Sequence, residues 1–173
     1  MRTINTIVIH HSCTPQDWSI KKTIDVINEE HKKLHAVANS INLHVSYHFL
    51  VFPDGTVKDT RPVNEIGFHA GNFPVNLVSI GVCLIGNFET DKPTEKQSKA
   101  LKTLLGSLTK QYKIPLSNIK LHKEVRLSPT LCPGKHITHK YLDDLLAHKP
   151  SMKSKILRKL RLIRFRKLRN QHS

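Results

Sequence analysis

The run VSIGVCLI at residues 78–85 is nearly continuous apolar sequence, and it constrains the fold more than any other stretch. A strand with one wet face alternates apolar and polar residues, whereas a strand covered on both faces is apolar throughout. We therefore predict a central strand over 78–85. A second short apolar run predicts another buried strand at residues 6–10, which ends in a pair of histidines.

The remaining segments alternate between strand and helix signals. Residues 46–52 are rich in aromatic and β-branched side chains, and the Pro-Asp-Gly turn that follows predicts a hairpin with residues 56–60. Apolar residues at helical spacing predict helices at 20–38, 94–112 and 138–148, with an irregular segment at 64–74. We expect one α/β domain with a central mixed β-sheet flanked by helices.

Residues 121–134, LHKEVRLSPTLCPG, hold the most specific chemistry in the chain. His122 and Cys132 are both good zinc ligands, and the prolines between and after them predict a loop. His10 sits at the end of the first strand, where ligand-binding residues of open α/β sheets collect. Two His and one Cys leave a fourth position open, so this set predicts a catalytic rather than a closed structural zinc site.

Other histidines and cysteines have simpler interpretations. His11 points away from His10 if the strand continues, which favours structural support over ligation. His31 and His35 have helical zinc spacing, but the Glu of the metalloprotease helix is missing between them. Three cysteines do not suggest a disulfide framework, and Cys83 is expected to be a buried small residue.

Two further positions are candidates for contact with a ligand. Strict alternation places Tyr47 on one side of its strand with Phe49 and Val51, so core packing is an alternative to a functional role. The loop GFHAGN at 67–72 carries His69 between glycines, and loops of this kind often carry function.

Charge is concentrated at the end of the chain. The formal net charge is +15, and ten of the 28 Lys and Arg residues lie in 149–173, a segment without Asp or Glu. A helix there would be basic and amphipathic, which suits an anionic membrane or lipopolysaccharide, while a solvated tail is the alternative. Nucleic acid is a weaker candidate. The sequence thus divides into a domain at 1–148 and a basic amphipathic tail at 149–173.

Five segments in this order resemble a known family. They are IVIHHS at 7–12, VSYHF at 45–49, FHAGN at 68–72, SIGVCLIGNF at 79–88, and His122 with CPG at 132–134. The pattern resembles the type 2 N-acetylmuramoyl-L-alanine amidases, which include phage lysozyme-like amidases and peptidoglycan recognition proteins. The resemblance covers residues 2–146. It implies an enzyme that cleaves the lactyl–L-alanine amide of peptidoglycan, and that Zn²⁺ is its cofactor.

The resemblance also implies roles for individual residues. His10, His122 and Cys132 would hold zinc, Tyr47 and Thr130 would act in catalysis, and His69 and Asn72 would contact substrate. Thr130 matches a position that is Lys in some phage enzymes and Thr in the recognition proteins.

Two departures separate the chain from the cell-wall-recycling branch. Members of that branch usually have Asp as the third ligand and Glu in the central strand, whereas this chain has Cys132 and no acid at 81–85. We therefore expect a phage-type endolysin. A non-catalytic recognition module, a regulatory protein that binds a partner through its basic surface, and a cytosolic recycling amidase are the alternatives.

The expected location follows from the same features. The first apolar run is too short for a secretory signal peptide. We expect synthesis in the cytoplasm, action on the cell wall after release during host lysis, and a monomeric protein.

Overall fold

The computed structural model describes residues 2–34 and 36–147. The basic tail at 149–173 and His35 lie outside these residues. The elements, in chain order, are β1 Thr6–His11, α1 Ile20–Lys33, β2 Phe49–Val51, β3 Val57–Asp59, α2 Phe73–Val78, β4 Ser79–Leu84, α3 Glu95–Tyr112, the short 3₁₀ helix η1 Leu116–Asn118, β5 Ile119–Leu121, α4 His122–Val125 and α5 His139–Ala147.

The five strands form one mixed sheet in the order β3-β2-β4-β1-β5. β4 and β1 are its central pair and run parallel, with Ile7 opposite Ile80 and Ile9 opposite Val82. β2 and β5 also run parallel to their central neighbours, and only β3 is antiparallel. The predicted central strand is confirmed, and β4 is buried at every residue because both faces of the sheet are covered.

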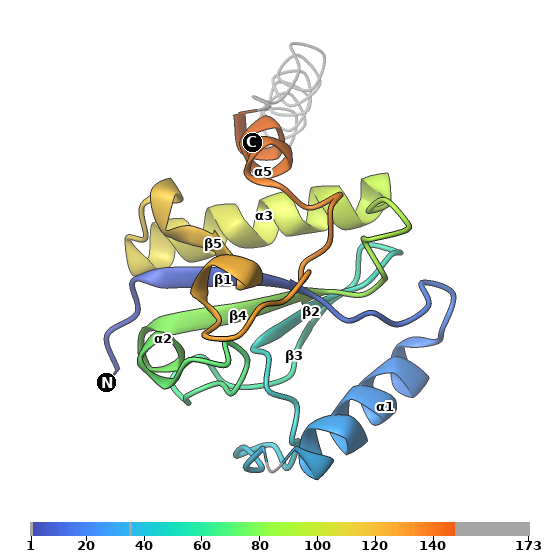
Figure 1. Cartoon of the computed structure of the whole chain (residues 1–173), viewed down its shortest axis with the longest axis vertical. Coiled ribbons are helices and arrows are strands. Elements are labelled where there is room, and N and C mark those ends of the chain that lie inside the picture. Colours follow the sequence, from blue (N-terminus) through green and yellow to red (C-terminus); the bar gives the residue numbers. More distant parts are fainter. Residues whose placement is uncertain (1, 35, 148–173) are drawn as a thin grey trace, which may run out of the picture.

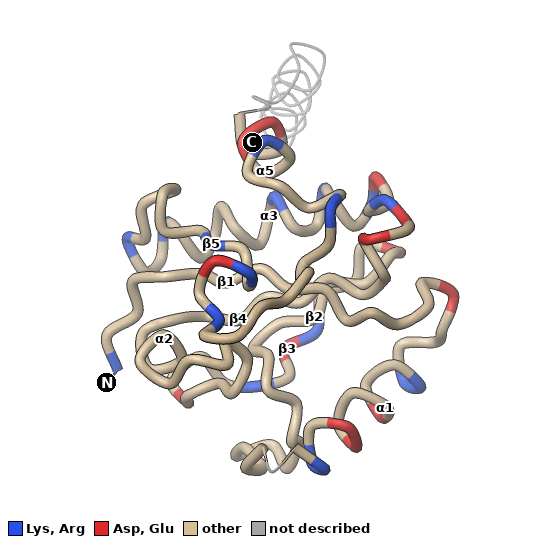
Figure 2. The backbone as a smooth tube through the Cα atoms, viewed as in Figure 1, with Lys and Arg blue, Asp and Glu red and all other residues tan. Residues whose placement is uncertain are grey.

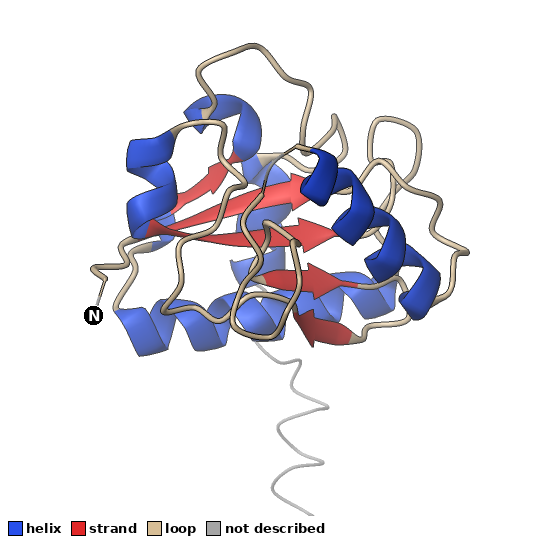
Figure 3. Ribbon diagram, turned by 90° about the horizontal axis from the view of Figure 1, so that it is seen from below, coloured by secondary structure: helices blue, strands red, loops and turns tan. Residues whose placement is uncertain are grey.

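Helices cover both faces of this sheet. Figure 1 places α3 and α5 on one side and α1 on the other, and Figure 3 shows α1 in front of the strands with α3 behind them. The larger apolar core lies under α3, where Ile9 and Val82 of the sheet pack with Leu101 and Leu105 of the helix. A smaller core lies on the α1 side and contains Ile27, Leu50 and Cys83. The predicted α/β class is therefore confirmed.

The helix boundaries follow from local capping. Ser19 accepts a hydrogen bond from the amide of Lys22 and begins α1, and Thr94 accepts one from the amide of Gln97 and begins α3. The Gln97 side chain in turn donates to the carbonyls of Val51 and Ile85, at 2.9 Å each, which ties α3 to the sheet. Thr94 therefore caps α3, and the side chain of Gln97 is a buried link between the helix and the sheet.

Three details of the predicted elements were wrong. α1 ends at Lys33 rather than at 38, and the segment predicted as irregular up to residue 74 already contains the start of α2, with a proline in its first turn. The strand predicted over 46–52 is only three residues long, because the ladder with β4 begins at Phe49.

Lys and Arg are interspersed with Asp and Glu over the helices and loops (Figure 2). Among the described residues, no helix has the length and apolarity needed to span a membrane.

Candidate metal centre

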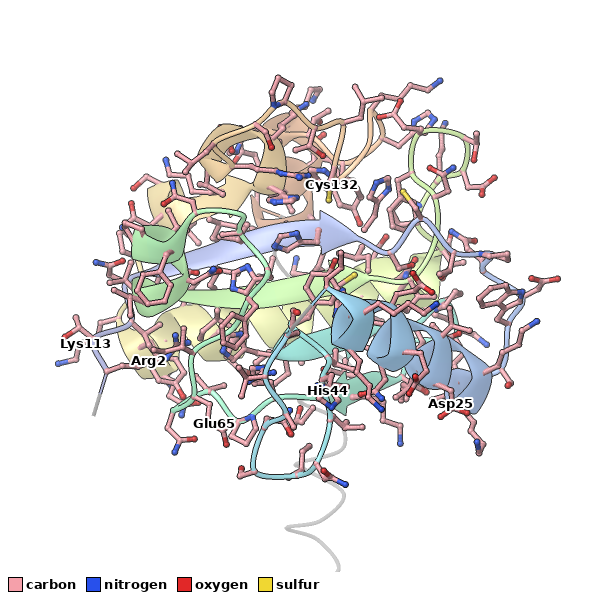
Figure 4. All side chains as sticks on the ribbon, turned by 60° about the horizontal axis from the view of Figure 1, so that its bottom comes forward. Arg2, Asp25, His44, Glu65, Lys113 and Cys132 are labelled. Carbon is pink, nitrogen blue, oxygen red and sulfur yellow. The ribbon has the colours of Figure 1, made fainter. Side chains whose placement is uncertain are left out.

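The fold brings the three predicted zinc ligands together at one edge of the sheet. His10 lies near the carboxyl end of β1, and His122 follows directly after the neighbouring strand β5. Their imidazole centroids are 4.3 Å apart. Cys132 returns from the following loop, and Figure 4 shows it beside the end of β1. One ligand atom from each residue lies within 4.8 Å of the others.

The sheet register and the loop anchoring explain this convergence. β1 and β5 are parallel, with Ile9 opposite Leu121. The residues that follow these positions in the two strands therefore reach the same edge of the sheet. The Cys132 carbonyl accepts a hydrogen bond from the amide of Lys123, at 2.9 Å, which closes the loop between the two ligands. The Cys132 amide donates to the Thr130 hydroxyl oxygen, at 3.2 Å. His122 is the first residue of the short helix α4.

The donor atoms fit a metal ion. The Nε2 of His122 donates to the Ala70 carbonyl, at 3.2 Å, which leaves Nδ1 as the acceptor nitrogen. That Nδ1 is buried and has no hydrogen-bond partner among the described residues. A buried polar atom without a partner is costly, and a cation beside His10 and Cys132 would satisfy it.

Burial favours the neutral form of all three side chains, which suits metal binding by the histidines but not by the cysteine. Burial lowers the pKa of His122 to about 4, and burial together with the neighbouring imidazoles puts the pKa of His10 well below its usual value. Both rings are therefore neutral at pH 7. Burial raises the pKa of Cys132 to about 12, so the thiol alone stays protonated. A bound cation reverses that preference, because a coordinating thiol loses its proton.

A pocket of about 250 Å³ opens next to these ligands. It is lined by His31, Leu34, Ala36, Ser46, Tyr47, Phe68, His69, Gly71, His122 and Arg126. We predicted that Tyr47 shares a side of its strand with Phe49 and Val51. That prediction was wrong. Tyr47 packs instead with the α1-side cluster, because it precedes the pleated part of β2.

Tyr47 consequently sits between two histidines. Its ring centroid lies 5.0 Å from that of His10 and 5.1 Å from that of His31. Burial, followed by the nearby thiols of Cys83 and Cys132, raises the pKa of Tyr47 well above its usual value. The phenol therefore keeps its proton and can act as a hydrogen-bond donor.

The other predicted site residues lie around this group in different ways. His69 lines the pocket, and its Nδ1 is 3.1 Å from the Nε2 of His10. Asn72 donates from its amide to the Val125 carbonyl, at 2.9 Å, and so ties its loop to α4. The Thr130 oxygen accepts from the Cys132 amide, which leaves its own hydroxyl proton unassigned. Catalytic and substrate-binding roles for these residues stay predictions.

Two histidines that we did not expect to be metal ligands, His11 and His31, have structural hydrogen-bond partners. The Nδ1 of His11 accepts from the Phe88 amide, at 3.1 Å, on the face of the sheet opposite His10. The Nδ1 of His31 accepts from the Ser46 amide, at 2.9 Å. Arg126 is a pocket residue that the sequence reasoning missed, although its position four residues after His122 could have drawn attention to it.

Comparison with known proteins identifies the family. A model of the N-acetylmuramoyl-L-alanine amidase family matches residues 1–135. The chain belongs to this family. Among curated relatives, the endolysin of Klebsiella phage KP32 is 32% identical over 133 residues, which cover 74% of this chain and 79% of that protein. Peptidoglycan-recognition protein SC2 of Drosophila melanogaster is 36% identical over 93 residues, or 54% of this chain.

The match covers 49% of the Drosophila SC2 protein, so the chain spans about half the length of that relative. Among solved structures, the N-acetylmuramoyl-L-alanine amidase LysC from Clostridium intestinale URNW has a TM-score of 0.68 and 30% identity. That alignment covers 86% of this chain and 88% of the amidase. A chain from the ectodomain complex of peptidoglycan recognition proteins LCa and LCx, solved with tracheal cytotoxin bound, gives a TM-score of 0.63 and 29% identity, with 83% of this chain and 82% of that chain covered. The two structural alignments each cover more than four fifths of this chain.

Proposed function

We propose that the chain is a zinc-dependent N-acetylmuramoyl-L-alanine amidase. It hydrolyses the amide bond between the lactyl group of N-acetylmuramic acid and L-alanine in peptidoglycan. The observation that carries this proposal is the cluster of His10, His122 and Cys132 beside a pocket, with the Nδ1 of His122 buried and unpartnered. Membership of the amidase family agrees with it.

The first proposed role is metal binding. His10, His122 and Cys132 hold the metal with two nitrogens and one sulfur, which leaves a position for water and substrate. Zinc held by these residues would lower the pKa of its water, which gives a nucleophile near neutral pH, and would polarise the carbonyl of the substrate amide.

We propose that two hydroxyls, those of Tyr47 and Thr130, stabilise the charge that develops on the substrate. Tyr47 stays protonated because of its burial and donates to the carbonyl oxygen as negative charge develops there. The Thr130 hydroxyl oxygen accepts a hydrogen bond from the Cys132 amide, and its O–H would donate a hydrogen bond to the same substrate oxygen. A well-placed donor of this kind contributes about 3–4 kcal/mol to the transition state.

The biological role we propose is that of a phage-type endolysin that acts on the cell wall after release from the cytoplasm. The KP32 endolysin supports it, because the similarity covers most of both chains. Peptidoglycan is the proposed substrate, and the recognition proteins bound to tracheal cytotoxin share this fold. The third ligand is Cys132 rather than Asp, which argues against the recycling branch.

The test is amine release from purified sacculi, without new reducing sugar. We expect activity in the wild type and none in Cys132→Ala or in wild type treated with a chelator. Cys13→Ala is the matched control, since Cys13 is an exposed thiol outside the ligand cluster and its loss should leave activity intact. A folded, zinc-loaded wild type that releases no amine would leave a recognition module, and activity on soluble anhydro-muropeptides alone would indicate a recycling enzyme.

The basic segment 149–173 carries a separate proposal, contact with an anionic membrane or lipopolysaccharide. The test compares the full chain with a variant that lacks residues 149–173. Binding to anionic liposomes should fall while amine release from sacculi persists, and unchanged liposome binding would contradict the proposal.

A further inference from the structure

A buried row of polar side chains lies behind the ligand His10. The Nε2 of His10 is 3.1 Å from the Nδ1 of His69, and the Nε2 of His69 is 3.4 Å from the Ser79 hydroxyl oxygen. All three residues are buried, with exposed fractions of 0%, 6% and 0%. His69 was expected to contact substrate, but its two ring nitrogens face protein groups. Contact with substrate stays a prediction for His69, and its position points to a role in orienting His10.

One assignment of protons satisfies the whole row. The Nδ1 of His10 faces Cys132, at 3.9 Å from its sulfur, so this nitrogen must keep its lone pair if it is to bind a metal. The proton of the neutral His10 ring is then on Nε2, and it donates to the Nδ1 of His69. His69 in turn carries its proton on Nε2, where the Ser79 hydroxyl oxygen accepts it.

Two glycines make room for the His69 ring. A Cβ on Gly81 would lie 2.5 Å from the Cδ2 of His69 and 2.6 Å from its Cγ. A Cβ on Gly67 would lie 2.7 Å from the same Cδ2. Real Cβ atoms essentially never approach this closely, so no other residue fits at either position without moving the ring. Gly81 lies in the middle of β4, where glycine normally weakens a strand, and the close approach of His69 explains it.

We propose that His69 is a positioning residue that accepts a hydrogen bond from the Nε2 of His10 and thereby fixes the orientation and tautomer of this zinc ligand. The inference rests on the proposed zinc site. Histidines that bind metals almost always donate their other ring N–H to a carboxylate, carbonyl or water, and removal of that partner costs about tenfold to a hundredfold in metal affinity. Here a second imidazole, itself oriented by Ser79, takes the place of the usual oxygen acceptor.

Three variants of the full chain separate the hydrogen bond from mere packing. His69→Leu keeps much of the volume but has no acceptor. His69→Asn places an amide oxygen close to the position of Nδ1 and restores the acceptor. Ser79→Ala removes only the last member of the row. Urea denaturation of each metal-free variant shows whether it folds.

The first measurement is zinc affinity, by competition with a chromophoric chelator. We expect His69→Leu to bind zinc about 10–100 times more weakly than the wild type. His69→Asn should recover most of this loss, and Ser79→Ala should lose less than His69→Leu. Equal affinity in wild type and His69→Leu would overturn the proposal, and equal losses in the Leu and Asn variants would show that the ring only fills space.

The second measurement needs no metal. Nitrogen NMR of the metal-free protein reports which ring nitrogen of His10 carries the proton. The wild type should show the Nε2–H form, and His69→Leu should show a mixture with the Nδ1–H form. A wild type that binds no zinc but has the Nε2–H form would refute the proposed function and leave the positioning role intact. The Nδ1–H form in the wild type would refute the positioning role.

Discussion

Gly81→Ala is the sharpest test of how the sheet supports the metal centre. The added methyl would lie 2.5 Å from the nearest His69 carbon, whereas unstrained carbon atoms stay about 3.5–4.0 Å apart, so ring or strand must move by about 1 Å. The ring cannot retreat freely, because His10 and Ser79 hold its two nitrogens and Gly67 lies against its edge.

The expected cost follows from this overlap. Overpacking a well-filled core typically destabilises a protein by about 1–3 kcal/mol, and we expect Gly81→Ala to lower the free energy of unfolding by that amount. Part of the strain can be relieved by displacing His69 from His10, so zinc affinity should fall as well. Urea denaturation of the metal-free protein and chelator competition measure the two effects separately.

Gly106→Ala is the matched control. Gly106 lies within α3, and a Cβ there would meet nothing within 4 Å. Alanine in a helix is more stable than glycine by about 0.5–1 kcal/mol, so this variant should gain stability and keep its zinc affinity. A Gly81→Ala protein as stable as the wild type, with unchanged zinc affinity, would refute the idea that the glycine exists to admit the His69 ring.

Three further predictions concern stability. Gln97→Ala should lower the free energy of unfolding by about 1–3 kcal/mol in urea titrations, because it removes the two buried hydrogen bonds that join α3 to the sheet. Thr94→Ala should cost about 1 kcal/mol by the same assay, since it removes the N-cap of α3. Stability should also fall with acid. Burial lowers the pKa of His31 to about 4 and that of His48 to about 3. The folded protein therefore holds both rings neutral, while the unfolded chain protonates them below about pH 6.5. Their contribution to stability is complete above that pH, and it is lost as the pH falls towards 4 for His31 and towards 3 for His48. In metal-free protein, His31→Gln should reduce the slope of unfolding free energy between pH 6 and 4.5 by up to about 1.4 kcal/mol per pH unit, and an unchanged slope would contradict the assignment.

The sequence by itself determined the framework and singled out the residues that we propose as metal ligands. Continuous apolar runs mark β4 and β1 because both faces of these strands are covered. His10 was recognisable as a site residue because it ends a buried strand, and His122 and Cys132 because of their chemistry and the loop between them. These are local signals, and they need no knowledge of distant contacts.

The tertiary structure decided how those residues are oriented. Tyr47 faces the ligands because β2 begins only at Phe49, and the pairing with β4 sets that starting point rather than the alternation of residues. The contact of His69 with His10 joins residues 59 positions apart in the chain. It depends on the register between strands and on the space left above Gly81. Strand register is a property of paired segments, so which nitrogen of His10 is free for a metal was readable only in the folded chain.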